Sequence, residues 1–267
     1  MKDRVSIDFK DGVADVRLIR ADKMNALDPS MFDGIIEAGV QLAATNGLRA
    51  VVLSGEGKAF CAGLDMASFA AMKKDGDAVP GVRDLVTRTH GIANRPQHCA
   101  FLWRELPVPV IAAVHGVAFG GGFQIALGAD MRYAAPDARF SVMEIKWGLV
   151  PDLGGTQLMR HLMREDVVRE LTYTGRIFDG REAQQLGVVT RVVDDPRAAA
   201  VETAREIAAK SPDAVRAAKR LLNLAVATDA KAGLMAESVE QQKLIGSPNQ
   251  LEAVASNLQK RAANYRD

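Results

Sequence analysis

Two glycine-rich segments each follow an apolar run of the kind that forms a buried strand. One extends from Gly55 to Asp65 after the run at 50–55, and the other extends from His115 to Phe123 after the run at 108–114. Glycine adopts backbone torsions that other residues avoid and lets a ligand approach the main chain. Where a helix begins, its first N–H groups are free and its dipole is positive. Two such N–H groups aimed at one oxygen would form an oxyanion hole, and each donor is worth about 3 kcal/mol in the transition state.

The glycine segments on their own leave a second interpretation open, because glycine clusters are also common in tight turns that bind nothing. The second segment lacks the Gly-Lys-Ser/Thr of a nucleotide phosphate loop and the Gly-x-Gly-x-x-Gly of a dinucleotide-binding fold. Both of those phosphate-binding patterns are therefore excluded there, and an oxyanion hole and a plain turn remain.

Two carboxylates in the second half of the chain could supply acid–base chemistry. Glu144 lies among apolar neighbours beside the predicted strand at 138–141, where burial would raise its pKa, or it could be a surface charge at the strand end. Asp152 shortly precedes Gly154 and Gly155. It could act in catalysis, or it could cap a helix that begins at those glycines, because aspartate is a favoured N-cap residue.

Three other side chains have structural explanations beside chemical ones. Trp147 could line a pocket or pack in a core or interface. Cys61 could be a nucleophile, but no partner base is identifiable, which favours a small buried apolar group. His115 immediately precedes a glycine of the second segment, and we interpret it as a structural hydrogen-bonding residue rather than a catalytic one.

The elements that must position these groups alternate between strand and helix. Two runs of alternating polarity, 5–9 and 13–18, flank Asp11-Gly12, which is a strong hairpin signal. Asp28-Pro29-Ser30 is typical of a helix start. Together with the buried strands and short strands at 131–134 and 138–141, this alternation predicts an α/β core.

Two further regions have distinct compositions. Residues 73–81 are expected to form a surface loop, followed by a helix that ends near Glu105. After Pro196 the sequence is rich in alanine, leucine and charged residues and predicts three or four helices. Their apolar faces require a partner surface, either the core or another subunit.

The composition excludes several classes of protein. The 267 residues carry a net charge of +1, which gives no reason to expect a nucleic acid or an anionic membrane as partner. Cys61 and Cys99 alone make neither a disulfide framework nor a zinc site, so we expect no metal and a reducing, cytoplasmic location. The N-terminus does not look like a signal peptide, and no apolar run is long enough to span a bilayer.

Three segments together resemble the signature segments of the crotonase (enoyl-CoA hydratase/isomerase) superfamily. They are Ala59 to Asp65, His115 to Gly122 and Leu149 to Thr156, and they occur in the order and at the spacing of that family. Residues 20–27, 174–176 and 183–189 resemble it as well, so that the likeness covers roughly residues 5–260. Each segment alone is weakly specific, whereas the ordered set is strongly specific.

The resemblance implies a fold and a ligand. The expected fold is an α/β spiral of repeated ββα turns over residues 1–195, with a helical region at 196–267 that packs in a homotrimer or a dimer of trimers. The expected substrate is a coenzyme A thioester, with no separate cofactor.

The resemblance also assigns roles to individual residues. The oxyanion donors are the backbone N–H groups of Leu64 and Gly121. The implied ligand contacts surround the two glycine-rich segments and comprise Lys23, Met24, Ala62, Gly63, Leu64, Asp65, Met66, Gly121 and Gln124. Lys23 could meet a phosphate or could be a solvated surface lysine.

The sequence departs from the family at two positions. In hydratases of this family two glutamates share one water, and the first of them stands at the position of Gln124, which cannot exchange a proton. The second stands at Glu144. Asp152 replaces a small residue of typical hydratases and matches an aspartate of dienoyl-CoA isomerases, which also keep an acid at the position of Gln124.

These observations predict an enzyme that forms an enolate-like intermediate. The leading interpretation is an enoyl-CoA isomerase or hydratase that uses Glu144 and Asp152. The alternatives are a thioester hydrolase or another lyase that activates water with one of these carboxylates, and a binding protein without catalytic activity. The presence of Glu144 argues against the last of these.

Overall fold

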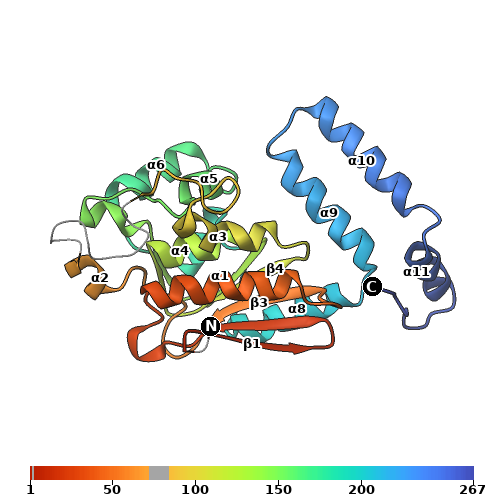
Figure 1. Cartoon of the computed structure of the whole chain (residues 1–267), viewed down its shortest axis with the longest axis horizontal. Coiled ribbons are helices and arrows are strands. Elements are labelled where there is room, and N and C mark those ends of the chain that lie inside the picture. Colours follow the sequence, from red (N-terminus) through yellow and green to blue (C-terminus); the bar gives the residue numbers. More distant parts are fainter. Residues whose placement is uncertain (2, 72–83) are drawn as a thin grey trace.

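A six-stranded sheet forms the centre of the chain, and helices pack on both of its faces (Figure 1). The strand order is β1-β2-β3-β4-β6-β9, in which β1 and β2 are antiparallel and the other neighbours are parallel. The structure, a computed structural model, describes residue 1 and residues 3–71 and 84–267. The predicted surface loop at 73–81 lies outside the described residues.

The chain begins with the predicted hairpin. Strands β1 (Val5–Lys10) and β2 (Val13–Leu18) pair along their whole length. Asp11 and Gly12 connect them with φ values of 52° and 79°. Positive φ at both central residues is what a type I′ turn requires, and this turn matches the twist of the two strands.

The central strand β3 (Ala50–Gly55) is buried along its whole length, because both of its faces are covered. Val51 and Leu53 belong to the larger hydrophobic core, together with residues of helix α1. Ala50 and Val52 belong to a smaller core on the opposite face. The sheet is therefore the middle one of three layers, and the predicted α/β class is confirmed.

Pairs of strands connect the large sheet to a small one. The first strand of each pair, β4 or β6, lies in the six-stranded sheet, and the second, β5 or β7, lies in a three-stranded sheet of order β5-β7-β8. An isolated bridge between Cys61 and Ala118 brings the segment after β3 beside β5 in the same way. Each turn of chain thus repeats the previous one, as expected for a ββα spiral. The bounds of these strands are Val110–Val114 for β4, Val117–Phe119 for β5, Met131–Ala134 for β6, Arg139–Ser141 for β7, Phe178–Asp179 for β8 and Arg191–Val192 for β9.

Several helices begin at residues whose side chains accept from the free N–H groups of the first turn. Helix α1 (Pro29–Ala43) begins where the sequence predicts it, and the Met31 N–H donates to Asp28 Oδ1 at 2.7 Å. Helix α3 (Arg95–Glu105) ends as predicted and begins with a capping box. The remaining helices before residue 196 are η1 (Ala21–Lys23), α2 (Met66–Ala71), α4 (Gly121–Gly128), η2 (Met143–Trp147), α5 (Gly155–Met159), α6 (Glu165–Thr174) and α7 (Gly180–Gln185).

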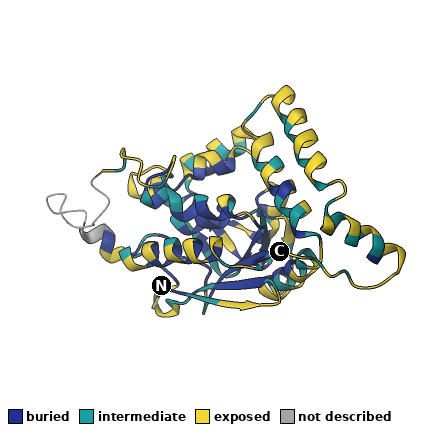
Figure 2. Cartoon of the chain, turned by 45° about the vertical axis from the view of Figure 1, so that its right-hand side comes forward, coloured by how far each residue is buried: buried dark blue, intermediate teal, exposed yellow. Residues whose placement is uncertain are grey.

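Four helices follow Pro196, in agreement with the sequence. They are α8 (Pro196–Ala208), α9 (Pro212–Ala225), α10 (Ala230–Leu244) and α11 (Pro248–Leu258). The first of them, α8, packs on the sheet through Ala200 and Ala204. The other three extend away from the sheet, and α10 has no buried residue (Figures 1 and 2). No helix in the described part of the chain is long and apolar enough to cross a membrane.

A buried lysine attaches α9 to the rest of the molecule. Lys219 Nζ lies 3.0 Å from Trp103 O, 2.8 Å from Val108 O and 2.8 Å from Asp130 Oδ2, and the residue is only 6% exposed. We expect Lys219→Met to lower the free energy of unfolding by about 3 kcal/mol, because it removes the donor to two buried carbonyls and leaves the Asp130 carboxylate without its ion-pair partner. Chemical denaturation measures this loss. The exposed Lys210 provides the control, since Lys210→Met should leave the midpoint unchanged.

Candidate active site

A cavity of about 670 Å³ lies where the two glycine-rich segments meet the loop after η2. It collects the predicted site residues from distant parts of the sequence, and Gln124 is the one predicted residue that does not line it. The predicted residues on its wall are Lys23, Met24, Ala62, Gly63, Leu64, Asp65, Met66, Gly121, Glu144 and Asp152. The sequence therefore identified the wall of one cavity from segments more than a hundred residues apart.

The two glycine-rich segments run side by side at the centre of this wall. The Cys61 N–H donates to Val117 O at 3.0 Å, and the Phe119 N–H donates to Cys61 O at 3.1 Å. Gly63 has a φ of +90°, and a Cβ there would lie 2.7 Å from Phe119 O and 3.8 Å from Gly121 N. Only glycine fits such a conformation and such a close approach.

The N–H groups of Leu64 and Gly121 are the donors that this arrangement leaves free. Gly121 is the first residue of α4, so its N–H has no partner within the helix. Leu64 follows Gly63 and lies beside Leu27 in a parallel bridge. Among the described residues, neither N–H donates to a protein acceptor. Both residues line the cavity, where a ligand oxygen could accept from them.

Glu144 lies next to the start of α4. The residue is 9% exposed, and Gln124 Nε2 donates to its Oε1 at 2.6 Å. Its Oε2 is buried and has no hydrogen-bond partner within the described ranges. A Cβ at Gly120, whose φ is +50°, would lie 3.2 Å from Oε1, so both the backbone conformation and the close approach of the carboxylate favour glycine there.

Burial determines the protonation of Glu144. Desolvation raises its pKa above the usual range, the charge of Asp152 raises the pKa further, and the hydrogen bond from Gln124 acts in the opposite direction. A buried carboxylate with one free oxygen at a cavity wall is a suitable proton acceptor.

This raised pKa predicts how stability depends on pH. Because the folded state holds the proton of Glu144 more tightly than the unfolded chain, stability falls as pH rises from the ordinary glutamate pKa to the raised one. Glu144→Gln removes the buried charge, so we expect it to stabilise the protein at neutral pH by roughly 0.5–2 kcal/mol. Thermal unfolding at pH 7 and pH 4 tests this, since the gain should disappear at the lower pH. Glu165→Gln, at an exposed position on α6, should give no gain at either pH.

Asp152 lies in the loop before α5, on the same cavity wall. Burial raises its pKa as well. The alternative interpretation of Asp152 as a helix cap is wrong, because Gly154 is the N-cap of α5 and no side chain caps the helix from that position. Gln124 performs this task instead, since its Oε1 accepts from Leu153 N at 2.9 Å and from Gly155 N at 2.8 Å.

Gln124 lies behind the wall rather than on it. Its residue is fully buried, and its side-chain amide is bonded to Glu144 and to the loop before α5. The predicted contact of Gln124 with a ligand thus remains a prediction, while its structural contacts are with the two segments that carry the carboxylates. The sequence contained no sign of this, because residues 124, 144 and 153 are far apart in the chain.

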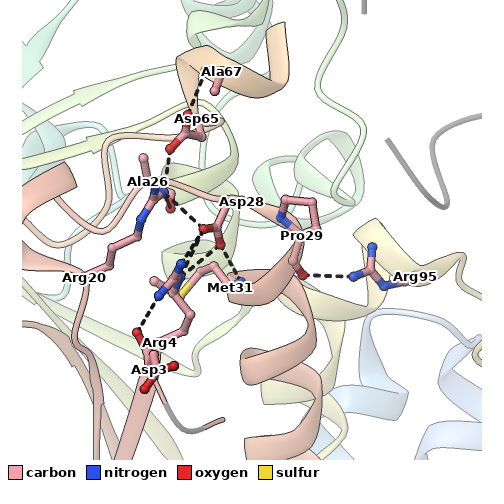
Figure 3. A network of polar contacts seen from close by, with 10 residues as sticks. All are labelled: Asp3, Arg4, Arg20, Ala26, Asp28, Pro29, Met31, Asp65, Ala67 and Arg95. Atoms are coloured by element: carbon pink, nitrogen blue, oxygen red, sulfur yellow. Dashed lines mark hydrogen bonds and ion pairs between the residues drawn. The ribbon is translucent and has the colours of Figure 1, made fainter. Parts of the chain in front are cut away.

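A network of ion pairs supports the cavity at Asp65 (Figure 3). Arg20 Nη1 lies 2.5 Å from Asp65 Oδ2 and 3.0 Å from Ala26 O, and the Ala67 N–H donates to Asp65 Oδ1 at 2.8 Å. Burial opposes the ionisation of Asp65, but the Ala67 N–H and the Arg20 guanidinium together outweigh it and lower its pKa. Asp65 is therefore a fixed anion that connects the start of α2 to the segment at 20–26.

Trp147, Cys61 and His115 lie in three different environments. Trp147 lines the cavity and is 41% exposed. Cys61 is completely buried, which raises the pKa of its thiol to about 12, and its Sγ lies 3.1 Å from Asn25 O. A neutral, enclosed thiol of this kind is not a nucleophile. His115 Nε2 lies 3.0 Å from Gly57 O, which confirms a structural hydrogen bond between the two glycine-rich segments.

Sequence reasoning missed one side of the cavity. Pro29 and Phe32 from the start of α1, and Arg95 from the start of α3, also line it. Arg95 donates to Asp33 Oδ1 at 2.5 Å. It also donates to Pro29 O at 3.0 Å (Figure 3). No local motif marks these residues. The sequence around a helix N-terminus reveals the capping residue, but it does not reveal which surface the helix end faces in the fold.

Comparisons with known proteins agree on one family. The family model described as Enoyl-CoA hydratase/isomerase matches residues 8–267. The mitochondrial Delta(3,5)-Delta(2,4)-dienoyl-CoA isomerase of Homo sapiens is 37% identical over 78% of this chain and 64% of its own length. The mitochondrial methylglutaconyl-CoA hydratase of Mus musculus is 30% identical over 96% of this chain and 80% of its own. The crystal structure of an enoyl-CoA hydratase from Polaromonas sp. JS666 matches with a TM-score of 0.88 at 27% identity, over 98% of this chain and all of that one.

Proposed function

Because the chain belongs to the enoyl-CoA hydratase/isomerase family, which is part of the crotonase superfamily, we propose that it is an enoyl-CoA isomerase. In this proposal it moves a carbon–carbon double bond of an acyl thioester by shifting a proton. One observation carries the proposal: Glu144 and Asp152 line the same cavity as the free N–H groups of Leu64 and Gly121, and the pKa of both carboxyls is raised by burial.

The thioester carbonyl oxygen would accept hydrogen bonds from the Leu64 and Gly121 N–H groups. These donors stabilise the negative charge that develops on the oxygen when a proton leaves the carbon chain. The positive end of α4 favours the same charge. The coenzyme A portion would lie along the part of the wall formed by Lys23, Met24 and the segment at 62–66.

Proton transfer then needs one base and one acid. Glu144 Oε2, which has no partner among the described residues, takes the proton from carbon, and the electron pair passes through the conjugated chain to the thioester oxygen. Asp152, protonated, gives its proton to a more distant carbon, and the carbonyl re-forms with the double bond in a new position. Exchange with water after product release restores both carboxyls.

Isomerisation is favoured over hydration by the residue at 124. A glutamine cannot take or give a proton, and the oxygen and nitrogen of this one are bonded within the protein. The hydratases that resemble this chain use a glutamate there to share the attacking water with the second glutamate. A relative with 37% identity is named as a dienoyl-CoA isomerase. It is Asp152, and not Gln124, that matches the isomerases of this kind, since they keep an acid at the position of Gln124.

Product analysis decides the proposal. The purified protein is incubated separately with 2-enoyl, 3-enoyl and 3,5-dienoyl coenzyme A thioesters, and the products are separated and weighed by mass spectrometry. We expect an isomer of unchanged mass from at least one of them. A product heavier by one water would indicate a hydratase, and release of free coenzyme A would indicate a hydrolase; either result without isomer would overturn the proposal.

We further propose that the protein is a homo-oligomer, a trimer or a dimer of trimers. Helices α9–α11 expose large apolar residues, among them Leu222 at 69%, Leu234 at 64% and Leu258 at 80% (Figure 2). Such surfaces are usually covered by another protein surface. Light scattering of the full chain should give three or six times the mass of one chain, and the mass of a single chain would overturn this.

A further inference from the structure

One buried side chain joins three of the segments that carry the proposed chemistry. Gln124 comes from α4, the helix that supplies the Gly121 N–H. Its Nε2 donates to Glu144 Oε1 at 2.6 Å, and its Oε1 accepts from Leu153 N and Gly155 N, on either side of Gly154. Leu153 is the residue next to Asp152. The same amide thus contacts one carboxylate directly and the backbone beside the other.

These contacts determine which way the amide of Gln124 points. Two N–H donors converge on one end of the side chain, so that end must be the oxygen, and the NH₂ group must face Glu144. The Glu144 Oε1 atom is then occupied by a donor, whereas the buried Oε2 has no partner among the described residues and belongs to a residue that lines the cavity. A residue that only filled space would not impose this orientation.

We propose that Gln124 is a positioning residue, which holds Glu144 and the Asp152 loop in one fixed geometry and keeps Glu144 Oε2 directed at the substrate. This inference rests on the proposed function, because it assumes that the two carboxyls exchange protons with the substrate. Gln124 itself does not line the cavity, so it acts through its neighbours.

The hydrogen bond from Gln124 also affects the ionisation of Glu144. Burial and the charge of Asp152 both favour the protonated form, and the Nε2–H donor favours the carboxylate. Among the described residues, Asp152 is the one ionisable group whose charge acts on Glu144. Helix α6 packs against η2, and its charged residues form ion pairs away from Glu144: Glu165 with Arg169, Asp166 with Arg164, and Glu170 with Arg176. Without its donor, Glu144 would be protonated over a wider range of pH and would be a poorer base.

Two substitutions separate the contacts of Gln124. Gln124→Glu keeps an oxygen for the Leu153 and Gly155 N–H groups but replaces the donor to Glu144 with a second carboxyl, so that the two carboxyls must share a proton. Gln124→Met removes all of the contacts in a side chain of similar size. The matched control is Gln157→Glu, which makes the same chemical change at an exposed position of α5.

The readout is the titration of Glu144 in full-length protein labelled with ¹³C at the glutamate carboxyl. The Glu144 signal is assigned as the one that Glu144→Gln removes. We expect the Glu144 signal to titrate at higher pH in both Gln124 variants and to be unchanged in Gln157→Glu. The kinetics are measured with a thioester that the wild type isomerises. For this substrate, kcat of Gln124→Glu should fall about 10²-fold while KM stays the same, as expected for a misplaced catalytic group.

The titration of Glu144 does not require turnover. The proposed isomerase function and the positioning role of Gln124 are therefore tested independently. If no thioester is isomerised, the proposed function is wrong whatever the titration shows. If the wild type isomerises a thioester but the Glu144 titration is the same in Gln124→Glu, Gln124→Met and Gln157→Glu, then Gln124 has no positioning role. The NMR spectrum of Gln124→Glu also shows whether this variant is folded. If it is unfolded, the fall in kcat is caused by unfolding, although the variant keeps the acceptor for the loop before α5.

Discussion

Glu144→Gln is expected to lower kcat for double-bond migration by about 10³-fold, within the usual range for loss of a general base. The substitution keeps the shape of the side chain and still offers an oxygen to Gln124 Nε2, which lies 2.6 Å away. The cavity wall is unchanged, so KM should stay within a few fold. Steady-state kinetics with the thioester that the wild type isomerises fastest will measure both constants.

The pH profile gives this prediction a second test. Glu144 must be ionised to accept a proton, and burial raises its pKa, so wild-type activity should fall as pH drops through a range above that of an ordinary glutamate. The residual activity of Glu144→Gln should lack this acidic limb. Glu165→Gln, at an exposed position, should keep both the wild-type rate and the fall in activity at acidic pH. Full activity in Glu144→Gln would transfer the role of base to Asp152.

The features predicted correctly from the sequence are those determined by local physics. The hairpin at Asp11-Gly12 follows from a turn that requires positive φ, and the start of α1 follows from an aspartate that caps it. The buried strand β3 is recognisable because a strand covered on both faces is mostly apolar, as residues 50–53 are. The glycine-rich segments indicated close backbone approach, which Gly63 confirms at 2.7 Å from Phe119 O.

The features that the sequence could not provide depend on contacts between distant segments. Asp152 and Gly154 fit the pattern of a helix cap, but the acceptor for the α5 N–H groups comes from Gln124, about thirty positions earlier. In the sequence, Gln124 stands where hydratases of the family have a catalytic glutamate, so it suggested only that one proton-transfer group is missing. Only its burial and its three partners show that the same position connects the Glu144 carboxylate to the backbone that follows Asp152. Helix α8 illustrates the same limit, since composition groups it with α9–α11 whereas packing places it on the sheet.

The second large effect is expected from removing one backbone donor. Gly121 is the first residue of α4, a position where proline is tolerated because its missing N–H has no helical partner. Gly121→Pro therefore removes the proposed oxyanion donor while the helix can still form. We expect kcat to fall by about 10²- to 10³-fold, the usual loss for one donor of an oxyanion hole.

The control for this substitution must separate the lost donor from the added bulk. A Cβ at Gly121 would lie 2.8 Å from Leu27 Cδ1 and 3.4 Å from Leu153 Cδ2, so any side chain here displaces the flexible end of a leucine. Gly121→Ala adds this carbon and keeps the N–H, and it should therefore retain most of the activity that Gly121→Pro loses. Equal losses in the two variants, with both proteins folded by circular dichroism, would mean that space rather than the N–H of residue 121 matters. In that case the oxyanion would have to be stabilised elsewhere, and the assignment of Leu64 as its second donor would lose its support as well.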